Sequence, residues 1–277
     1  MKKIFYLLLS VFLFCSKQLW AHEPLFGLGP ELIRTGGFAI EGEIEHEKRG
    51  YEKETTVNYD IMYGVTEYLA ISAEIPFFIN KEDLDEQTNQ INKSAGLGKI
   101  EIRAKLRIYK DYLYGKRDQA VLIGGFRLPT VGLHKNPFLE NRLLDFIIAL
   151  AAGREMLKNS YFGTVAYDIK TQANGLQDGN ELTLTLAAGF RPETATYYNL
   201  DWLFFIEIDG VFTAKDRSAD QEDQDSGGYV FFIGPTIFAS KKNILLKAGI
   251  QVPMIEHVNG QQVKHDLRFA VGLDLHF

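Results

Sequence analysis

The sequence predicts an all-β fold, namely a transmembrane antiparallel up-and-down β-barrel of about 12 strands. Apolar and polar residues alternate with a period of two, the alternating segments are about twelve residues long, and the links between them alternate between long and short. Strands of soluble sheets most often hold ~5–6 residues, whereas a tilted strand needs ~9–11 residues to cross a membrane. Outer-membrane barrels also have short turns at one end and longer loops at the other.

The alternation is clearest in two segments. At 267–277 every odd-numbered residue is apolar, and the even-numbered residues include Arg268, Asp274 and His276. At 99–108 every even-numbered residue is apolar and every odd-numbered residue is charged. Because successive strand residues point to opposite faces, each segment forms one apolar and one polar face as a strand. On a helix the same apolar residues would spiral around the surface.

Residues 35–277 contain twelve such segments and are expected to form the whole barrel. We predict strands at 35–47, 54–65, 68–79, 98–109, 119–130, 142–154, 160–171, 180–191, 200–213, 228–239, 243–254 and 265–277. With these bounds the odd-numbered links average about eleven residues and the even-numbered links about five. Both termini are therefore expected at the short-turn, periplasmic end. The first strand should pair with the last, since an unpaired strand edge is costly in lipid.

The two longest links, 80–97 and 214–227, are rich in polar and charged residues. Connecting segments of this composition usually run over the surface, where water satisfies their backbone groups. We therefore expect both links to be water-exposed loops.

Residues 1–21 resemble a signal peptide for export. Lys2 and Lys3 form a charged start, residues 4–14 are apolar, and Ala21 offers a small residue for cleavage. We expect the mature chain to begin at His22.

Composition excludes several classes of protein. The one cysteine, Cys15, lies within the signal, so neither a disulfide scaffold nor a cysteine-based zinc site is expected. A lipoprotein beginning at Cys15 is disfavoured because bulky Phe14 precedes it. The net charge of −6 gives no basic face for nucleic acid.

The segment 22–34 is expected to be a periplasmic N-terminal arm or a plug in the mouth of the barrel. Pro24 and Pro30 disfavour a regular helix or a central strand there. His22 and Glu23 are two adjacent candidate metal ligands, but a stable site needs three or four. We therefore predict no metal site and no cofactor.

Several segments resemble a known family. The sequence HEPLFGLGP at 22–30, YGVTEYL at 63–69, GLGK at 96–99 and LPT at 128–130 are similar to bacterial outer-membrane proteins of the MetA-pathway of phenol degradation family. This resemblance covers the mature chain and implies an outer-membrane barrel with a transporter role. It implies no particular substrate and no catalytic residues.

The C-terminus carries a further resemblance. Leu273, Leu275 and Phe277 form an aromatic-ended pattern similar to the signal that the barrel assembly machinery recognises. The expected partners are therefore this machinery, outer-membrane lipid, lipopolysaccharide and small-molecule solutes.

If the apolar faces contact lipid, the polar faces line the lumen. The residues expected to line a pore are Glu41, Glu43, Glu45, Asp60, Glu74, Lys99, Glu101, Arg103, Lys105, Arg107, Arg127, Asp168, Glu207, Asp209 and Arg268. Both signs of charge are present, so this set by itself predicts no simple selectivity for cations or anions. The charges could line a water-filled pore or pair into a lattice that closes the barrel, because twelve strands fall between filled barrels of ~8 and open ones of ~16–18.

The favoured function is a porin-like channel that passes small polar or amphipathic solutes by passive diffusion across the bacterial outer membrane. A closed barrel that acts as a lipid-modifying enzyme is the first alternative. His46 and His265 are expected on the lipid-facing side near the outer rim, but no serine accompanies them in their strands, so we predict no enzyme. A surface receptor or adhesin that uses the acidic loops is the second alternative.

Overall fold

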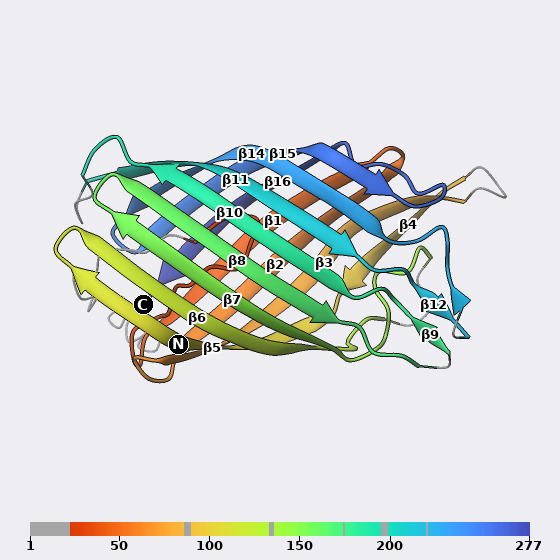
Figure 1. The fold of residues 1–277 in the computed structure, drawn as a ribbon, viewed down its shortest axis with the longest axis horizontal. Coiled ribbons are helices and arrows are strands. Elements are labelled where there is room, and N and C mark those ends of the chain that lie inside the picture. Colours follow the sequence, from red (N-terminus) through yellow and green to blue (C-terminus); the bar gives the residue numbers. More distant parts are fainter. Residues whose placement is uncertain (1–22, 86–89, 133–135, 174, 195–198, 220) are drawn as a thin grey trace, which may run out of the picture.

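The chain forms one closed antiparallel β-barrel whose strands cross it obliquely (Figure 1). The computed structural model describes residues 23–85, 90–132, 136–173, 175–194, 199–219 and 221–277. The barrel strands are β1 (Phe38–Arg49), β2 (Glu52–Gly64), β3 (Leu69–Asp85), β4 (Gln90–Leu97), β5 (Ile100–Leu113), β6 (Lys116–Leu128), β7 (Asp145–Met156), β8 (Asn159–Ile169), β10 (Glu181–Phe190), β11 (Asp201–Thr213), β14 (Gly228–Lys241), β15 (Ile244–Val258) and β16 (Leu267–His276). The described residues contain no helix with the length and apolar character needed to cross a bilayer.

Two pairings close the barrel and set its size. β1 pairs with β16, so that Ile44 lies opposite Val271, and β2 pairs with both β1 and β3. β3 pairs with β5 from Leu69 to Glu74 and with β4 from Phe77 to Asp85. Because β4 and β5 pair with successive halves of β3, they occupy one position in the barrel, which therefore has twelve. The predicted fold class and the pairing of the first strand with the last are confirmed.

The period of two in the sequence becomes an inner and an outer face. In β7, Phe146, Ile148 and Leu150 are exposed on the outside, whereas Ala149 and Ala151 are buried on the inside. The other long strands expose large apolar side chains in the same way. A continuous apolar exterior of this extent is not stable in water, and it suits hydrocarbon.

The two ends of the barrel differ. One end, called here the short-turn end, carries the turns at 65–68, 114–115, 157–158 and 242–243 together with Phe38 and Phe277. The rings of Phe38 and Phe277 stack there with centroids 4.8 Å apart. The opposite, long-loop end carries the described parts of the segments 129–144, 170–180 and 214–227, together with 259–266.

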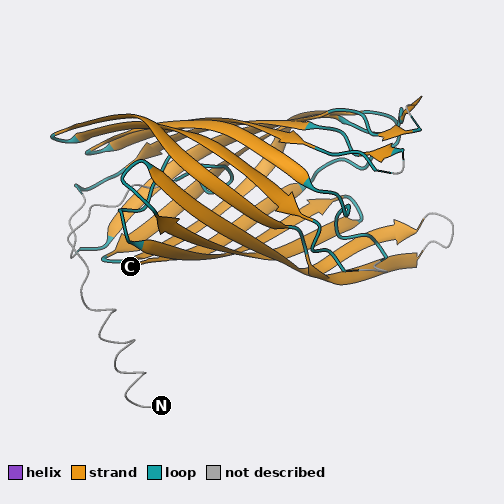
Figure 2. Ribbon diagram, turned by 90° about the horizontal axis from the view of Figure 1, so that it is seen from below, coloured by secondary structure: helices purple, strands orange, loops and turns teal. Residues whose placement is uncertain are grey.

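The prediction of a loop at 80–97 is wrong. β3 and β4 continue through this segment as a hairpin that projects beyond the barrel, as Figure 2 shows. Its polar residues pair across the strands, and Lys93 Nζ lies 2.5 Å from Glu82 Oε1. One face of the hairpin packs on the segment at 137–139, where Ser94 and Lys81 donate to the carbonyls of Pro137 and Leu139. Most of the other side chains are at least partly exposed to water, so the composition is polar although the backbone is regular. The other long link, 214–227, holds two short strands, β12 (Arg217–Ser218) and β13 (Gln221–Glu222), which form a small sheet with β9 (Leu176–Gln177).

The expectation that His265 faces lipid is also wrong. Its imidazole lies between two carboxylates, with Nδ1 2.5 Å from Glu256 Oε1 and Nε2 3.2 Å from Glu47 Oε1. Its ring also meets the edge of the inward-facing Phe232. The reason is that β16 begins at Leu267, so the alternation of that strand does not extend to His265.

The register of the closing seam can be tested by cross-linking. Cysteines replacing Ile44 and Val271 face each other directly across β1 and β16, with side chains on the same face. We expect the double variant I44C/V271C to form a disulfide after mild oxidation, detected by its electrophoretic mobility. In the control I44C/L273C the second cysteine is two residues out of register, about 7–8 Å away, and should stay reduced. Equal cross-linking of both pairs would contradict this register.

Candidate functional site

Residues 23–34, called here the arm, run through the inside of the barrel. Leu25 packs in an apolar cluster with Phe162, Leu203, Phe205 and Phe238 on the inner wall. At the other end of the arm, Leu32 packs in a second cluster, formed by Ala70, Val121, Ile123, Ala149, Ala151 and Ala166. Burial of each leucine contributes about 1.5–3 kcal/mol. The arm is therefore held against two separate parts of the barrel wall.

One buried carboxylate holds the start of the arm. Glu207 on β11 accepts hydrogen bonds from the backbone N–H groups of Leu25 (3.0 Å) and Phe26 (3.1 Å), one on each oxygen. The hydroxyl of Thr236 donates a third hydrogen bond, of 2.6 Å, to the same carboxylate. Glu207 is fully buried, so these donors replace the water that a carboxylate otherwise requires.

Lys105 on β5 holds the middle of the arm. Its Nζ lies 2.9 Å from Glu23 Oε1 and donates a hydrogen bond of 3.1 Å to the carbonyl of Gly29. The hydroxyl of Thr164 on β8 donates a 2.5 Å hydrogen bond to the carbonyl of Leu28. The polar contacts thus come from three different strands and tie the arm across the lumen.

Arg268 on β16 connects the arm to the wall formed by β11, β14 and β15. Its guanidinium lies over the rings of Phe26 (5.0 Å) and Phe232 (4.1 Å). It also forms an ion pair of 2.9 Å with the buried Asp209 and hydrogen bonds with Gln251. Arg268 and Asp209 therefore act here as supports of the arm.

Close contact with the wall requires glycine at two positions. A Cβ on Gly27 would lie 2.5 Å from the Thr185 hydroxyl, and a Cβ on Gly249 would lie 2.8 Å from the side chain of Leu25. Because both contacts are closer than carbon atoms tolerate, any larger residue would push the arm from the wall.

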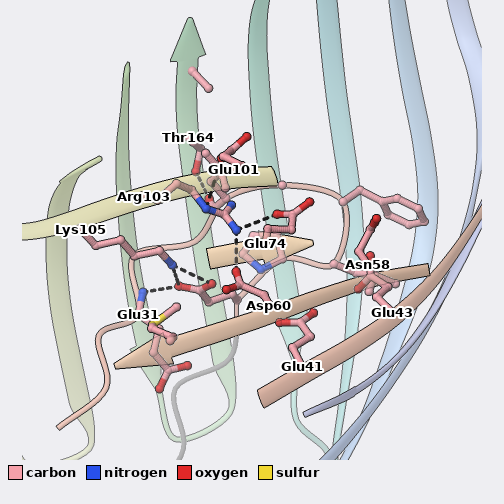
Figure 3. Close-up of a pocket in the computed structure, with 18 of the residues that line it drawn as sticks. Glu31, Glu41, Glu43, Asn58, Asp60, Glu74, Glu101, Arg103, Lys105 and Thr164 are labelled. Carbon is pink, nitrogen blue, oxygen red and sulfur yellow. Dashed lines mark hydrogen bonds and ion pairs between the residues drawn. The ribbon is translucent and has the colours of Figure 1, made fainter. Parts of the chain in front are cut away.

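An internal cavity of about 350 Å³ lies beside the arm (Figure 3). Eleven acidic residues line it: Glu23, Glu31, Glu41, Glu43, Glu45, Asp60, Glu74, Glu101, Asp168, Glu181 and Asp274. Four basic residues do so as well: Arg103, Lys105, Arg127 and Lys247. The lining therefore has an excess of seven acidic groups.

Three of the four cations each contact more than one carboxylate. Arg103 lies 2.5 Å from Asp60 and 2.7 Å from Glu74. Figure 3 marks both ion pairs with dashed lines. Arg127 lies 2.5 Å from both Glu101 and Asp168. Shared cations hold the carboxylates in place but leave part of the negative charge uncompensated.

Lys247 on β15 is the third such cation. It forms an ion pair with Glu41, lies 3.4 Å from Glu43 and lies 3.7 Å from Asp274. Because β1 contributes Glu41 and Glu43 while β16 contributes Asp274, Lys247 joins both strands of the closing seam.

Glu31 in the arm lies near Arg117 on β6. Burial raises the pKa of its carboxyl well above the ordinary value; the nearby Arg117 opposes this shift, and Glu23 adds to it. The Glu31 carboxyl binds its proton more tightly in the docked arm than in a free arm. Docking is therefore strongest at a pH below the pKa of the free carboxyl. Docking then weakens as the pH rises through the docked pKa.

The structure brings together ten of the fifteen residues predicted to line a pore. Those on the cavity wall are Glu41, Glu43, Glu45, Asp60, Glu74, Glu101, Arg103, Lys105, Arg127 and Asp168. The other five lie elsewhere: Glu207, Asp209 and Arg268 support the arm, Lys99 pairs with Asp145 at 2.5 Å, and Arg107 lies at the short-turn end.

Sequence reasoning did not place the carboxylates of the arm in the cavity. Glu23 and Glu31 lie on it because the arm enters the barrel, and no strand periodicity marks them. Alternation could have placed Asp274 in the lumen, because this residue lies on the polar face of its predicted strand. The predicted signal peptide and His22 lie outside the described residues.

Comparisons with known proteins show the fold. No family model and no curated protein matches the chain. Among solved structures, the COG4313 outer membrane channel from Pseudomonas putida F1 superposes with a TM-score of 0.73 at 10% identity, over 93% of this chain and 100% of that chain. The beta domain of the Bordetella autotransporter Brka gives 0.52 at 13% identity, over 88% and 100%. The chain thus has the fold of bacterial outer-membrane barrels, and membership of the MetA-pathway of phenol degradation family stays a prediction.

Replacing Glu207 should loosen the arm. In E207Q one carboxylate oxygen becomes an NH₂ group, so one of the two arm amides loses its acceptor, at a cost of about 1–3 kcal/mol. We expect faster hydrogen exchange at residues 25 and 26, measured by mass spectrometry. The control E181Q changes a cavity carboxylate whose described hydrogen bonds do not involve the arm. Unchanged exchange in E207Q would show that Glu207 does not hold the arm.

Proposed function

We propose that the protein is a channel of the bacterial outer membrane that passes small polar or amphipathic solutes passively, with the arm as its gate. The contacts of the arm are the main support for this proposal. The arm crosses the lumen of a closed barrel and is held by a few hydrogen bonds, ion pairs and two leucines, all of which are reversible contacts. A covalent or fully packed plug would not allow passage.

The described similarity supports this proposal at the level of the fold. One solved structure with this fold is the COG4313 outer membrane channel. In this proposal the short-turn end faces the periplasm, lipid and lipopolysaccharide surround the exposed apolar side chains, and the barrel assembly machinery recognises the C-terminal pattern at Leu273, Leu275 and Phe277. The proposal assigns the chain no catalytic activity.

The alternative is a barrel that stays closed. It is favoured by the same observation, because the arm and the shared ion pairs of the cavity fill much of the lumen. The two proposals predict different conductance, so removal of the arm separates them.

Deleting residues 22–33 should raise the single-channel conductance in planar bilayers, because the deletion removes all lumen-filling contacts of the arm. Folding of the variant is checked by the heat-dependent electrophoretic mobility typical of intact barrels. The full-length protein in the same bilayers is the reference. A folded deletion variant whose conductance equals that of the full-length protein would rule out the gate, and absence of conductance in both would favour the closed barrel.

We also propose that the open channel prefers cations. Eleven acidic and four basic side chains line the cavity. A pore whose lining has an excess of one sign of charge concentrates ions of the opposite sign. The sequence set, which mixes both signs, predicted no simple preference. The acidic excess is three in the predicted set and seven in the cavity lining. The lining gains Glu23, Glu31, Glu181, Asp274 and Lys247, and it lacks Glu207, Asp209, Lys99, Arg107 and Arg268.

This selectivity can be measured as a reversal potential in a potassium chloride gradient, with the arm deleted so that current flows. The deletion removes Glu23 and Glu31, and nine acidic and four basic residues of the cavity lining remain on the barrel wall. We expect a preference for potassium that decreases in the double variant E43Q/E45Q. The control E222Q neutralises an exposed glutamate of the small sheet outside the barrel and should leave the potential unchanged. A preference for chloride, or equal shifts in both variants, would contradict cation selectivity set by the cavity.

A further inference from the structure

A second cavity, of about 420 Å³, lies at the short-turn end and is called here the mouth pocket. Residues 32–35, at the exit of the arm, form one wall. Four cations line it, Arg34, Arg107, Lys110 and Arg117, and the acidic residue in its lining is Glu67. Its charge is thus opposite in sign to that of the internal cavity.

The positive charge of the mouth pocket is only partly neutralised. Lys110 lies 3.7 Å from Glu67, but both side chains are more than a third exposed, so the pair is weak. Arg117 lies 3.9 Å from Glu155, at the limit of an ion pair, and near Glu31 of the arm. The Arg34 side chain has no ion-pair partner among the residues that the structure describes.

Arg107 has an unused donor. Its Nη1 donates a 2.6 Å hydrogen bond to the carbonyl of Glu67, which fixes the guanidinium at the turn between β2 and β3. Its Nε is buried and has no hydrogen-bond acceptor within the described part of the chain. A buried N–H without an acceptor is destabilising, and an oxyanion is the acceptor that an arginine binds best.

The arm separates this basic pocket from the acidic cavity. Ile33 contributes to the lining of both, so a ligand in the mouth pocket lies beside the arm without entering the excess of carboxylates. An anion is therefore attracted to the mouth and repelled from the interior.

We propose that the mouth pocket is a binding site for a small oxyanion, a carboxylate or a phosphate, held by Arg107 and Arg34 in the field of Lys110 and Arg117. This site goes beyond the proposed channel function and does not depend on it. The ligand is a free solute, because the pocket is lined by the arm and by groups of the barrel mouth, and the outward-facing apolar side chains are not part of it.

The test is calorimetric titration of the mature full-length protein in a zwitterionic detergent with inorganic phosphate, and separately with succinate. We expect saturable binding of one or both, weakened roughly tenfold in R107Q and in R34Q, since each substitution removes a charge-assisted hydrogen bond. R107K keeps the charge but loses the planar guanidinium and its paired N–H donors, so this variant should bind with intermediate affinity.

The matched control is K241Q, which removes the same charge from an exposed residue at the short-turn end, outside the pocket. It should bind both anions like the unaltered protein. Lack of saturable binding of either anion to the unaltered protein would overturn the proposal. So would equal weakening in K241Q and R107Q, because it would reveal only diffuse surface charge. R34Q alters an exposed side chain without a described ion pair, so it remains informative if R107Q does not fold. Because the titration involves no ion flow, a protein without conductance could still bind the anion.

Discussion

The hydrogen-bonded seam between β1 and β16 is the constraint on which the rest of the structure depends. In hydrocarbon each unpaired backbone group costs several kcal/mol, so twelve strand positions are stable only as a closed ring. Closure fixes a circumference too large for inward side chains alone to fill, as they do in barrels of about eight strands. The remaining space has to be occupied by shared ion pairs, by the arm and by cavities.

The arm links the two halves of this interior. Leu25 and Leu32 replace side chains that the wall lacks, and the alanines around Leu32 leave the room that it needs. The buried Glu207 receives amide donors from the arm as well as the hydroxyl of Thr236, and the arm stays inside partly because Glu207 accepts its amides. This mutual dependence makes the arm part of the lumen while keeping its contacts reversible.

The arm lies between two regions of the lumen that carry opposite excess charge. The cavity on one side has an excess of carboxylates, and the mouth pocket on the other has an excess of cations. Ile33 stands between them. Acidic residues outnumber basic ones on the cavity side, and basic residues outnumber the acidic one on the mouth side, so the two regions attract solute groups of opposite sign.

The sequence by itself determined the strands, their inner and outer faces and the closed barrel, because a period of two and the lengths of the links are local properties of the chain. Local patterns failed at 80–97, where polar residues form a hairpin instead of a loop, and at His265, which lies outside its expected strand. Ten predicted lumen residues meet at the cavity, since alternation gives the facing of each side chain. Only the tertiary structure decided which inward residues are neighbours. Glu207 and Leu25, 182 positions apart, meet because barrel closure and arm insertion bring distant segments together, and no local pattern encodes that contact.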